Sequence, residues 1–324
     1  MIKFLLLKIV RFFYRLLSKI VYFFIPIISK IFLALRLNSR IINQLNQLRY
    51  QVHKTQNHYN FILKLLEKKQ LVALDVGAQG GFLNGSVFAF KYNKFFFPIV
   101  VEPIEEEAQK LIKKNYKVIS KGLWSKNCKK KLYVLNKRSG SSSMYKPNKN
   151  SFDLYNFKKK DLSLFDVSKE VDVECITIKE SLNNMQIKNL DFLKIDTQGS
   201  ELEILKGLGE YLPLMMKIEV QVITMYENVP DWSEIIYYLY KMNYMTCDWM
   251  EIGSHATRTP AEMDMIFIPN YLTEIGKKII LSREKEFVSL MIILGQIKLL
   301  QIISKKLNFI NNIEIQKLKD KFFH

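Results

Sequence analysis

Cysteine is scarce in this sequence, and its three cysteines follow no metal-binding or disulfide pattern. Cys128, Cys175 and Cys247 lie far apart and are odd in number, and no C-x-x-C or Cys/His spacing occurs. The spacing argues against a zinc site and against a disulfide framework. We therefore expect no metal ligands, three small buried thiols and a reducing, cytoplasmic environment.

Long uncharged runs are also missing from the N-terminal part. A membrane-spanning helix needs about 20 largely uncharged residues, but the longest such stretch within residues 1–37 is Ile20–Ser29, which contains Pro26. A secretory signal peptide has one basic region followed by one apolar run, whereas this segment mixes charge throughout, so only a weak signal anchor stays open. In the tail, Phe287–Ile297 is apolar and uncharged, and either core packing or membrane contact explains it.

Acidic residues are few at both ends of the chain, where most of the net charge of +18 is found. Residues 1–70 hold 13 Lys and Arg and one acid, Glu67, for +12; residues 271–324 hold 10 basic and 5 acidic residues, for +5; +1 remains for residues 71–270. A nucleic-acid enzyme usually carries its basic patch on the catalytic domain. We therefore expect no nucleic-acid partner and an anionic membrane surface instead. Compositional drift toward lysine is the alternative.

Basic residues of the N-terminal segment recur at helical spacing. Four of them fall on one face of a helix: Lys8, Arg11, Arg15 and Lys19. Leucine, isoleucine and phenylalanine occupy the opposite face, a pattern typical of a helix that lies in the lipid interface. We predict that residues 1–37 hold the protein peripherally on the inner face of a membrane. A helix packed on the protein's own core or on a partner is the alternative.

From residue 71 onward, strand-like apolar runs alternate with helical segments. Such alternation predicts βαβ units and a mainly parallel sheet. We expect an α/β, Rossmann-like domain over residues 71–270 with helices on both faces of the sheet, a helical connector over 38–70 and a C-terminal helical extension over 271–324. The expected strands are Leu71–Val76, Phe96–Val101, Tyr116–Ile119, Leu132–Leu135, Val171–Ile178, Leu190–Ile195, Leu214–Val222 and Met263–Ile268.

Local signals place two helices and one insertion. Pro103 suits the first turn of a helix that Asn115 closes, and Asp231 with Glu234 forms a capping-box start for another helix. Residues 136–170 are irregular and polar. This composition predicts an insertion between two paired strands.

The glycine-rich turn after the first predicted strand lacks the dinucleotide pattern. The sequence LVALDVGAQGG fits D-x-G-x-x-x-G, whereas a turn that binds pyrophosphate would read G-x-G-x-x-G. S-Adenosylmethionine has no pyrophosphate; it needs a short glycine turn for its amino-acid portion and an acceptor for its ribose hydroxyls. Glu102 ends the next strand and is placed to accept both hydroxyls. A tight turn and a solvated glutamate are the alternative.

A second group of polar residues follows the strand Leu190–Ile195. In NLDFLKIDTQGSELEILKG, Asp196 closes the strand, and Glu201 opens an amphipathic helix. Ligands of open α/β sheets lie beyond the carboxyl ends of the strands. We therefore expect both carboxylates at the mouth of one cleft.

The same stretch carries a family resemblance. The pattern D-F-L-K-I-D-x-Q-G-x-E-x-x-x-L-K-G resembles the signature of the FkbM family of S-adenosylmethionine-dependent methyltransferases, and L-D-V-G-A-x-x-G, V-E-P, a serine-rich stretch and the strand at Val173 follow in the family's order. The resemblance covers about residues 71–270 and departs at Gln79, where the family often has asparagine. It implies a class I fold and methyl transfer to a hydroxyl oxygen, of a sugar in a glycan or glycolipid.

The strand ends and the resemblance together indicate the site residues. For cofactor binding we predict Asp75, Gly77, Ala78, Gly81, Glu102, Gly122 and Asp196. Candidates for the general base that accepts the hydroxyl proton are Asp196, Glu201, Glu219 and His255. Each candidate has a structural alternative. Asp196 would only hold the cofactor's amino end, and Glu201 would only cap its helix. Glu219 would be a buried, hydrogen-bonded carboxylate, and His255 would face solvent in a loop.

Two rival functions stay open. The missing G-x-G-x-x-G weakens a nicotinamide-dependent Rossmann reductase. A non-catalytic membrane adaptor built on a decayed fold is weakened because Asp75, Gly77, Glu102, Asp196 and Glu201 are intact. The sequence carries no signal for the acceptor's identity, the methylated position or the oligomeric state.

Overall fold

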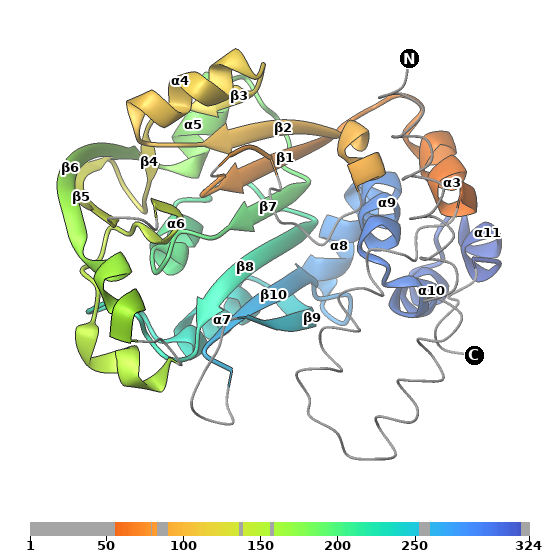
Figure 1. Ribbon diagram of the computed structural model, residues 1–324. Helices are drawn as coiled ribbons and strands as arrows, with labels where there is room; N and C mark the ends of the chain where they lie inside the picture. Colours follow the sequence, from red (N-terminus) through yellow and green to blue (C-terminus); the bar gives the residue numbers. More distant parts are fainter. Residues whose placement is uncertain are drawn as a thin grey trace, which may run out of the picture.

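The computed structural model describes residues 56–78, 80–82, 90–135, 139–155, 159–252 and 260–318 (Figure 1). The predicted amphipathic segment over residues 1–37 lies outside this range, as do Gln79 and His255. Within the described ranges, none of the helices has both the length and the apolar character that crossing a membrane requires.

A seven-stranded sheet forms the centre of the fold. Five neighbouring strands pair in parallel, and the sixth strand across the sheet is antiparallel to both of its neighbours. The predicted α/β, Rossmann-like fold with a mainly parallel sheet is therefore confirmed. The order across the sheet is β3 (Lys117–Ile119), β2 (Phe96–Val101), β1 (Leu71–Val76), β7 (Phe192–Ile195), β8 (Met215–Gln221), β10 (Glu262–Pro269) and β9 (Tyr244–Ile252).

The order of the strands reverses between β1 and β7. From β1 the chain extends the sheet outward through β2 and β3, and it later returns to add β7 on the other side of β1, where Asp75 pairs with Lys194. Ligands of open α/β sheets sit at the carboxyl ends of the strands beside such a reversal. The two strands that were predicted to end in site residues thus lie next to each other.

Apolar side chains cover both faces of the sheet. On one face, Leu71 and Phe192 belong to a core that also includes residues of the first described helix, of α4 and of the C-terminal helices. On the other face, Leu74 and Ile195 pack with residues of α5, α6 and α7. The prediction of helices on both faces is confirmed. The helices are α3 (Gln56–Leu66), α4 (Glu105–Lys113), α5 (Ile178–Asn184), α6 (Glu201–Lys206), α7 (Trp232–Lys241), α8 (Glu274–Ser282), α9 (Glu284–Leu294), α10 (Ile297–Lys306) and α11 (Asn312–Gln316).

The C-terminal helices share one apolar core with the central sheet. Every side chain of α9 from Phe287 to Leu294 is buried, and the Phe287 ring meets the buried Phe309 ring edge-on. The apolar run in the tail therefore packs in the core, which answers the question that the sequence left open.

Polar contacts join α9 to the amino ends of the strands. The Arg283 guanidinium donates to the Asp191 carboxylate at 2.9 Å and to the Leu190 carbonyl at 2.8 Å, just before β7. The ion pairs Lys69–Glu286 and Lys285–Glu67 link the segment before β1 to the start of α9. This end of the sheet is closed by residues that are distant in the sequence.

A second, three-stranded sheet lies beside the carboxyl ends of β1 and β2 (Figure 1). Its order is β4 (Gly122–Leu123), β6 (Val167–Ile176) and β5 (Cys128–Leu135). β5 and β6 pair antiparallel, and the 3-10 helices η2 (Ser139–Ser141), η3 (Lys149–Leu154) and η4 (Lys159–Phe165) lie between them in the chain. The predicted insertion between two paired strands is confirmed. The two-residue β4 and the edge strand β9 were not predicted.

Of the two predicted helix starts, one is confirmed and the other is wrong. Asp231 and Glu234 form a complete capping box at α7, as predicted. The position of Pro103 was predicted wrongly: α4 begins at Glu105 with Ile104 as its N-cap, so the proline precedes the helix. The Ile104 N–H is instead held by the Glu102 carboxylate, which is a contact that helix signals do not reveal.

Candidate functional site

The floor of the candidate site is the contact between the ends of β1 and β7. The Asp196 N–H donates to the Val76 carbonyl at 3.1 Å. Gly77 follows with a φ of +85°, and a Cβ built on it would lie 1.9 Å from the Asp196 carbonyl oxygen. Only glycine can therefore occupy this position, both for its backbone conformation and for the close approach of the two chains.

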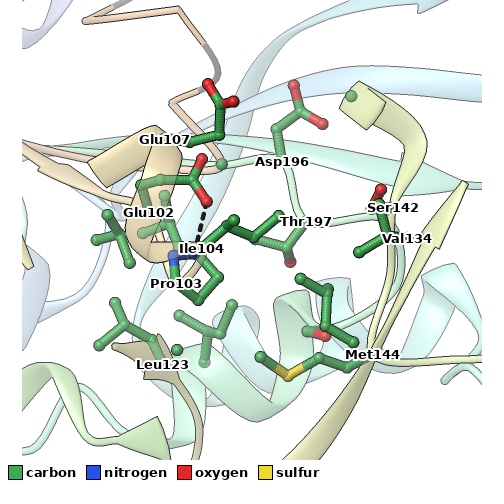
Figure 2. Close-up of a pocket in the computed structure, with 18 of the residues that line it drawn as sticks. Glu102, Pro103, Ile104, Glu107, Leu123, Val134, Ser142, Met144, Asp196 and Thr197 are labelled. Carbon is green, nitrogen blue, oxygen red and sulfur yellow. Dashed lines mark hydrogen bonds between the residues drawn. The ribbon is translucent and has the colours of Figure 1, made fainter. Parts of the chain in front are cut away.

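A cavity of about 280 Å³ opens above this floor. It contains four of the predicted cofactor residues, namely Gly77, Glu102, Gly122 and Asp196. Figure 2 shows Glu102 and Ile104 facing Ser142 and Val134 across the space. The other lining residues are Val76, Val101, Pro103, Glu106, Glu107, Leu123, Leu132, Gly140, Met144, Lys169, Thr197, Ser200 and Ile204.

Glu102 has one oxygen bound to the protein. Its Oε1 accepts the Ile104 N–H at 2.9 Å (Figure 2). Burial raises the pKa of Glu102, the hydrogen bond from Ile104 lowers it, and the nearby Glu107 carboxylate raises it again. The bond to the backbone fixes the orientation of a carboxylate at the cavity wall, where it can accept hydrogen bonds from a ligand.

Gly122 completes the wall on the side of the small sheet. A Cβ there would come within 2.7 Å of both the Cys175 Sγ and the Met144 Cε. The absence of a side chain keeps β4 close to β6, with which it pairs in parallel. The apolar part of the cavity depends on this close packing.

The lining carries an excess of negative charge. Glu102, Glu106, Glu107 and Asp196 contribute carboxylates, and Lys169 is the one basic residue in the set of lining residues. Such a lining favours a cationic ligand over a dianionic one, because Coulomb interactions strengthen where water is partly excluded.

Asp75 lies beneath the floor and does not line the cavity. Its side chain is fully buried, and Lys194 Nζ lies 3.2 Å from Asp75 Oδ1 and 3.4 Å from Asp196 Oδ2. Burial alone would lower the pKa of Lys194, but the two carboxylates outweigh it and raise the pKa. The lysine is thus held charged between them, and it ties Asp196 to β1 and β7.

Ala78 and Gly81 are also placed away from the cavity lining. Ala78 is buried in the apolar core on the α3 face of the sheet. Gly81 has a φ of +129°, and a Cβ built on it would lie 3.0 Å from the Tyr116 hydroxyl oxygen. In the structure both serve the packing of the turn after β1.

Glu201 is buried at the first position of α6 and faces the preceding loop. Its carboxylate accepts hydrogen bonds from the backbone N–H groups of Thr197 and Gly199 and from the Thr197 hydroxyl, at 2.9 Å each. Burial raises the pKa of Glu201, while the hydrogen bonds act in the opposite direction. Its oxygens are directed at the protein's own backbone, and it does not line the cavity.

Glu219 lies behind Asp196 on the adjacent strand and is joined to it through Gln198. The Gln198 Nε2 donates to Glu219 Oε1 at 2.5 Å and to Asp196 Oδ1 at 3.3 Å. Burial, followed by the charge of Asp196, raises the pKa of Glu219 well above its usual range. Gln198 adopts a φ of +60°, which is uncommon for a residue with a side chain. The two carboxylates are therefore held by one amide.

Sequence reasoning missed Lys194 and Gln198. A signal existed for the first, because a lysine inside the run Phe192–Ile195 places a charge in a strand that is otherwise apolar on both sides. For Gln198 the sequence gives only a polar residue before Gly199. Its tie to the insertion, through the Ser143 hydroxyl that donates to its carbonyl at 2.6 Å, depends on tertiary structure.

The fourth candidate base, His255, lies outside the described residues. In a comparison with protein families, the model of the methyltransferase FkbM domain matches residues 8–245. The matched range begins and ends earlier than the 71–270 expected from the resemblance. Comparison with curated proteins gives no match.

Proposed function

The chain belongs to the FkbM methyltransferase family, and from this premise we propose that it transfers the methyl group of S-adenosylmethionine to a hydroxyl group. The observation that carries the proposal is the convergence of Gly77, Glu102 and Asp196 on one cavity at the reversal point of the sheet. Two strand ends and a glycine turn meet there. S-Adenosylmethionine is a nucleoside with an amino-acid tail, and it needs a glycine turn for the tail and a carboxylate for its ribose hydroxyls.

The cavity offers a distinct partner for each part of that cofactor. The Glu102 carboxylate is suited to the ribose hydroxyls, because its orientation is fixed by Ile104. The apolar side chains of Ile104, Leu123 and Met144 suit a purine ring. The bare backbone at Gly77 allows close approach of the amino-acid portion.

The charge of the lining separates this proposal from the nicotinamide alternative. A dinucleotide brings a pyrophosphate, which the four carboxylates of the lining would repel and which a single lysine would not offset. S-Adenosylmethionine instead brings a sulfonium and an ammonium group, which the same carboxylates attract.

For the chemical step, the bound cofactor supplies a methyl group on a sulfonium that leaves as a neutral thioether. The chain must align the acceptor oxygen with that methyl group and receive the hydroxyl proton. Of the three described candidate bases, Asp196 is the one that lines the cavity. We assign it the proton, with Lys194 and Gln198 holding its carboxylate in place.

The acceptor is proposed to be a sugar hydroxyl of a glycan or glycolipid near the inner face of a membrane. The family resemblance supports the sugar, and the basic amphipathic pattern of residues 1–37 supports the membrane. A non-catalytic adaptor would bind the cofactor, or its product, without transferring methyl.

The cofactor claim is tested by thermal unfolding with S-adenosylhomocysteine and with NAD. We expect S-adenosylhomocysteine to raise the unfolding temperature and NAD to leave it unchanged. Glu102→Gln should weaken S-adenosylhomocysteine binding by about tenfold, because a charged acceptor is lost. Glu105→Gln on the exposed start of α4, outside the cavity lining, is the matched control. A shift with NAD alone would overturn the proposal.

The transfer claim is tested with labelled S-adenosylmethionine and the cell's glycan and lipid fractions. We expect label in a sugar-containing fraction and its loss in Asp196→Asn. Cofactor binding with no transfer to any fraction would favour the adaptor.

A further inference from the structure

Two isoleucines at the C-terminal end of the described chain are strongly exposed. Ile310 is 90% exposed and Ile313 is 73% exposed, and they lie three residues apart around the start of α11. Single exposed apolar residues are common. Here, however, the adjoining α10 adds Ile302, which is 55% exposed, so three large aliphatic side chains face solvent on two neighbouring elements. Exposed aliphatic side chains on adjoining elements are candidates for an interaction site.

Basic residues accompany these isoleucines. Residues 297–318 contain Lys298, Lys305, Lys306 and Lys317 against one acid, Glu314, and Glu284 of α9 accepts the Ile310 N–H beside them at 3.0 Å. Glu314 is paired with Lys64 of α3 at 2.9 Å. The inner side of α10 is buried through Ile297, Leu300 and Ile303, so helical spacing places Ile302 and Lys305 on the outer side.

Hydrogen bonds and core packing fix the backbone that carries the exposed isoleucines. The Ser304 hydroxyl donates to the Asn312 side chain at 2.9 Å, and the Gln301 amide donates to the Leu318 carbonyl at 2.9 Å. Phe309, next to Ile310, is buried against Phe287. Because the neighbouring residue is anchored in the core, Ile310 is held outward.

We propose that Ile302, Ile310 and Ile313, with Lys305 and Lys317, form a lipid-contact surface for an anionic membrane. The isoleucines would enter the interface, and the lysines would contact the head groups. A nucleic acid would use the lysines but gain nothing from the isoleucines. A second copy of the chain would carry the same positive charge, which opposes self-association.

The position of this lipid-contact surface also indicates which hydroxyl group of the acceptor the cavity can reach. This step rests on the proposed function. Ile310 N–H donates to Glu284 at the start of α9, directly after Arg283, which contacts the amino ends of the strands. The cavity lies at the carboxyl ends, and Figure 1 shows α10 and α11 at the end of the molecule away from β4, β5 and β6. A protein bound in this way would turn its cavity away from the bilayer. This favours a hydroxyl on a distal sugar over one at the lipid interface.

The lipid-contact surface is tested by co-sedimentation of the full chain with vesicles of phosphatidylcholine and phosphatidylserine. Ile310→Ser with Ile313→Ser should lower the partition constant by about tenfold, because two apolar side chains no longer enter the interface. Lys305→Gln with Lys317→Gln should lower it several-fold and weaken its dependence on salt. Vesicles of phosphatidylcholine alone should bind less than the mixed vesicles.

The matched control is Leu154→Ser with Leu162→Ser, the same kind of change at two residues that are 41% and 37% exposed on η3 and η4, in the insertion between β5 and β6. It should bind vesicles as the unaltered chain does. Two results would overturn the proposal: unchanged vesicle binding by the isoleucine variant, or loss of a dimer in that variant. Binding of heparin but not of vesicles would point to nucleic acid instead. S-Adenosylhomocysteine binding is measured in parallel, because its absence counts against the proposed function alone.

Discussion

The two ends of the central sheet are built for different purposes. At the amino ends, Arg283 fills the space before β7 and β8 and pairs with a buried carboxylate, Asp191. At the carboxyl ends, charged groups surround a cavity, and both Gly77 and Gln198 adopt positive φ values. At the amino ends, a buried carboxylate is paired with an arginine, whereas at the carboxyl ends several carboxylates surround the cavity.

This contrast between the two ends indicates which residues stabilise the fold and which bind a ligand. A buried ion pair resists loss of either partner, since the remaining charge is left uncompensated. Strained backbone and crowded carboxylates cost stability and persist where they serve a site. We therefore expect substitutions at the amino end to change unfolding without changing ligand binding, and substitutions at the carboxyl end to change binding.

The largest effect is expected from Gly77→Ala at the carboxyl end. The new Cβ would lie 1.9 Å from the Asp196 carbonyl oxygen, so β1 and β7 must separate at the floor of the cavity. We expect loss of S-adenosylhomocysteine binding and a destabilisation of more than about 4 kcal/mol. Calorimetric binding and denaturant unfolding measure the two effects.

Gly295→Ala is the control for Gly77→Ala. Gly295 ends α9 with a similar φ of +86°, away from the cavity lining. It should cost about 1 kcal/mol and leave binding intact. Equal loss of binding in both variants would break the comparison between the two ends.

A smaller effect is expected from Arg283→Met at the amino end. The substitution removes the guanidinium from Asp191, whose pKa is already raised by burial although Val72 N–H and Arg283 lower it. We expect a loss of about 3 kcal/mol in unfolding free energy with an unchanged affinity for S-adenosylhomocysteine. Lys285→Met, which removes an exposed pair with Glu67, should have no measurable effect. A change in affinity with Arg283→Met would show that the two ends are coupled.

The smallest effect is expected from Glu219→Gln. Because burial raises the pKa of Glu219 in the folded state, the carboxyl group stabilises the fold at low pH and loses that contribution as the pH rises through its folded pKa. The variant should therefore match the unaltered protein in acid and exceed its stability above neutral pH. Glutamine still accepts from Gln198 through its carbonyl oxygen.

Glu274→Gln is the control of opposite sign for Glu219→Gln. The hydrogen bond and charge of Lys277 lower the pKa of Glu274, so this variant should not gain stability with rising pH. Parallel curves for the two variants would contradict the assignment of Glu219 as a buried carboxyl group. Denaturant unfolding at several pH values measures both.

Much of the carboxyl end could be predicted from the sequence. The positions of Gly77, Glu102 and Asp196 follow from where apolar runs stop, because parallel strands end at the same edge of a sheet. The roles of Asp75 and Glu201 could not be read in this way. Each is an acid beside a strand or helix end, and whether it faces a cavity or the protein's own backbone depends on neighbours from other segments.

Little of the amino end could be predicted. The apolar run of α9 was visible, but its burial against α3 joins residues more than two hundred positions apart, as the pairs Lys69–Glu286 and Lys285–Glu67 show. Pairing over such separations leaves no periodicity in the sequence. The link from Gln198 to Glu219 spans only 21 residues, but it depends on the pairing of β7 with β8 and also leaves no periodicity in the sequence.

The amino-acid sequence was enough to predict the alternation of strands and helices, the glycine turn and the acids that end two strands, because these follow from local periodicity and from the conformational range of each residue. The folded chain was needed to show which carboxylates line the cavity, that Lys194 pairs with Asp75 and Asp196, and that the C-terminal helices close the opposite end. Burial and charge pairing depend on which distant segments come into contact, and that is settled only when the whole chain packs.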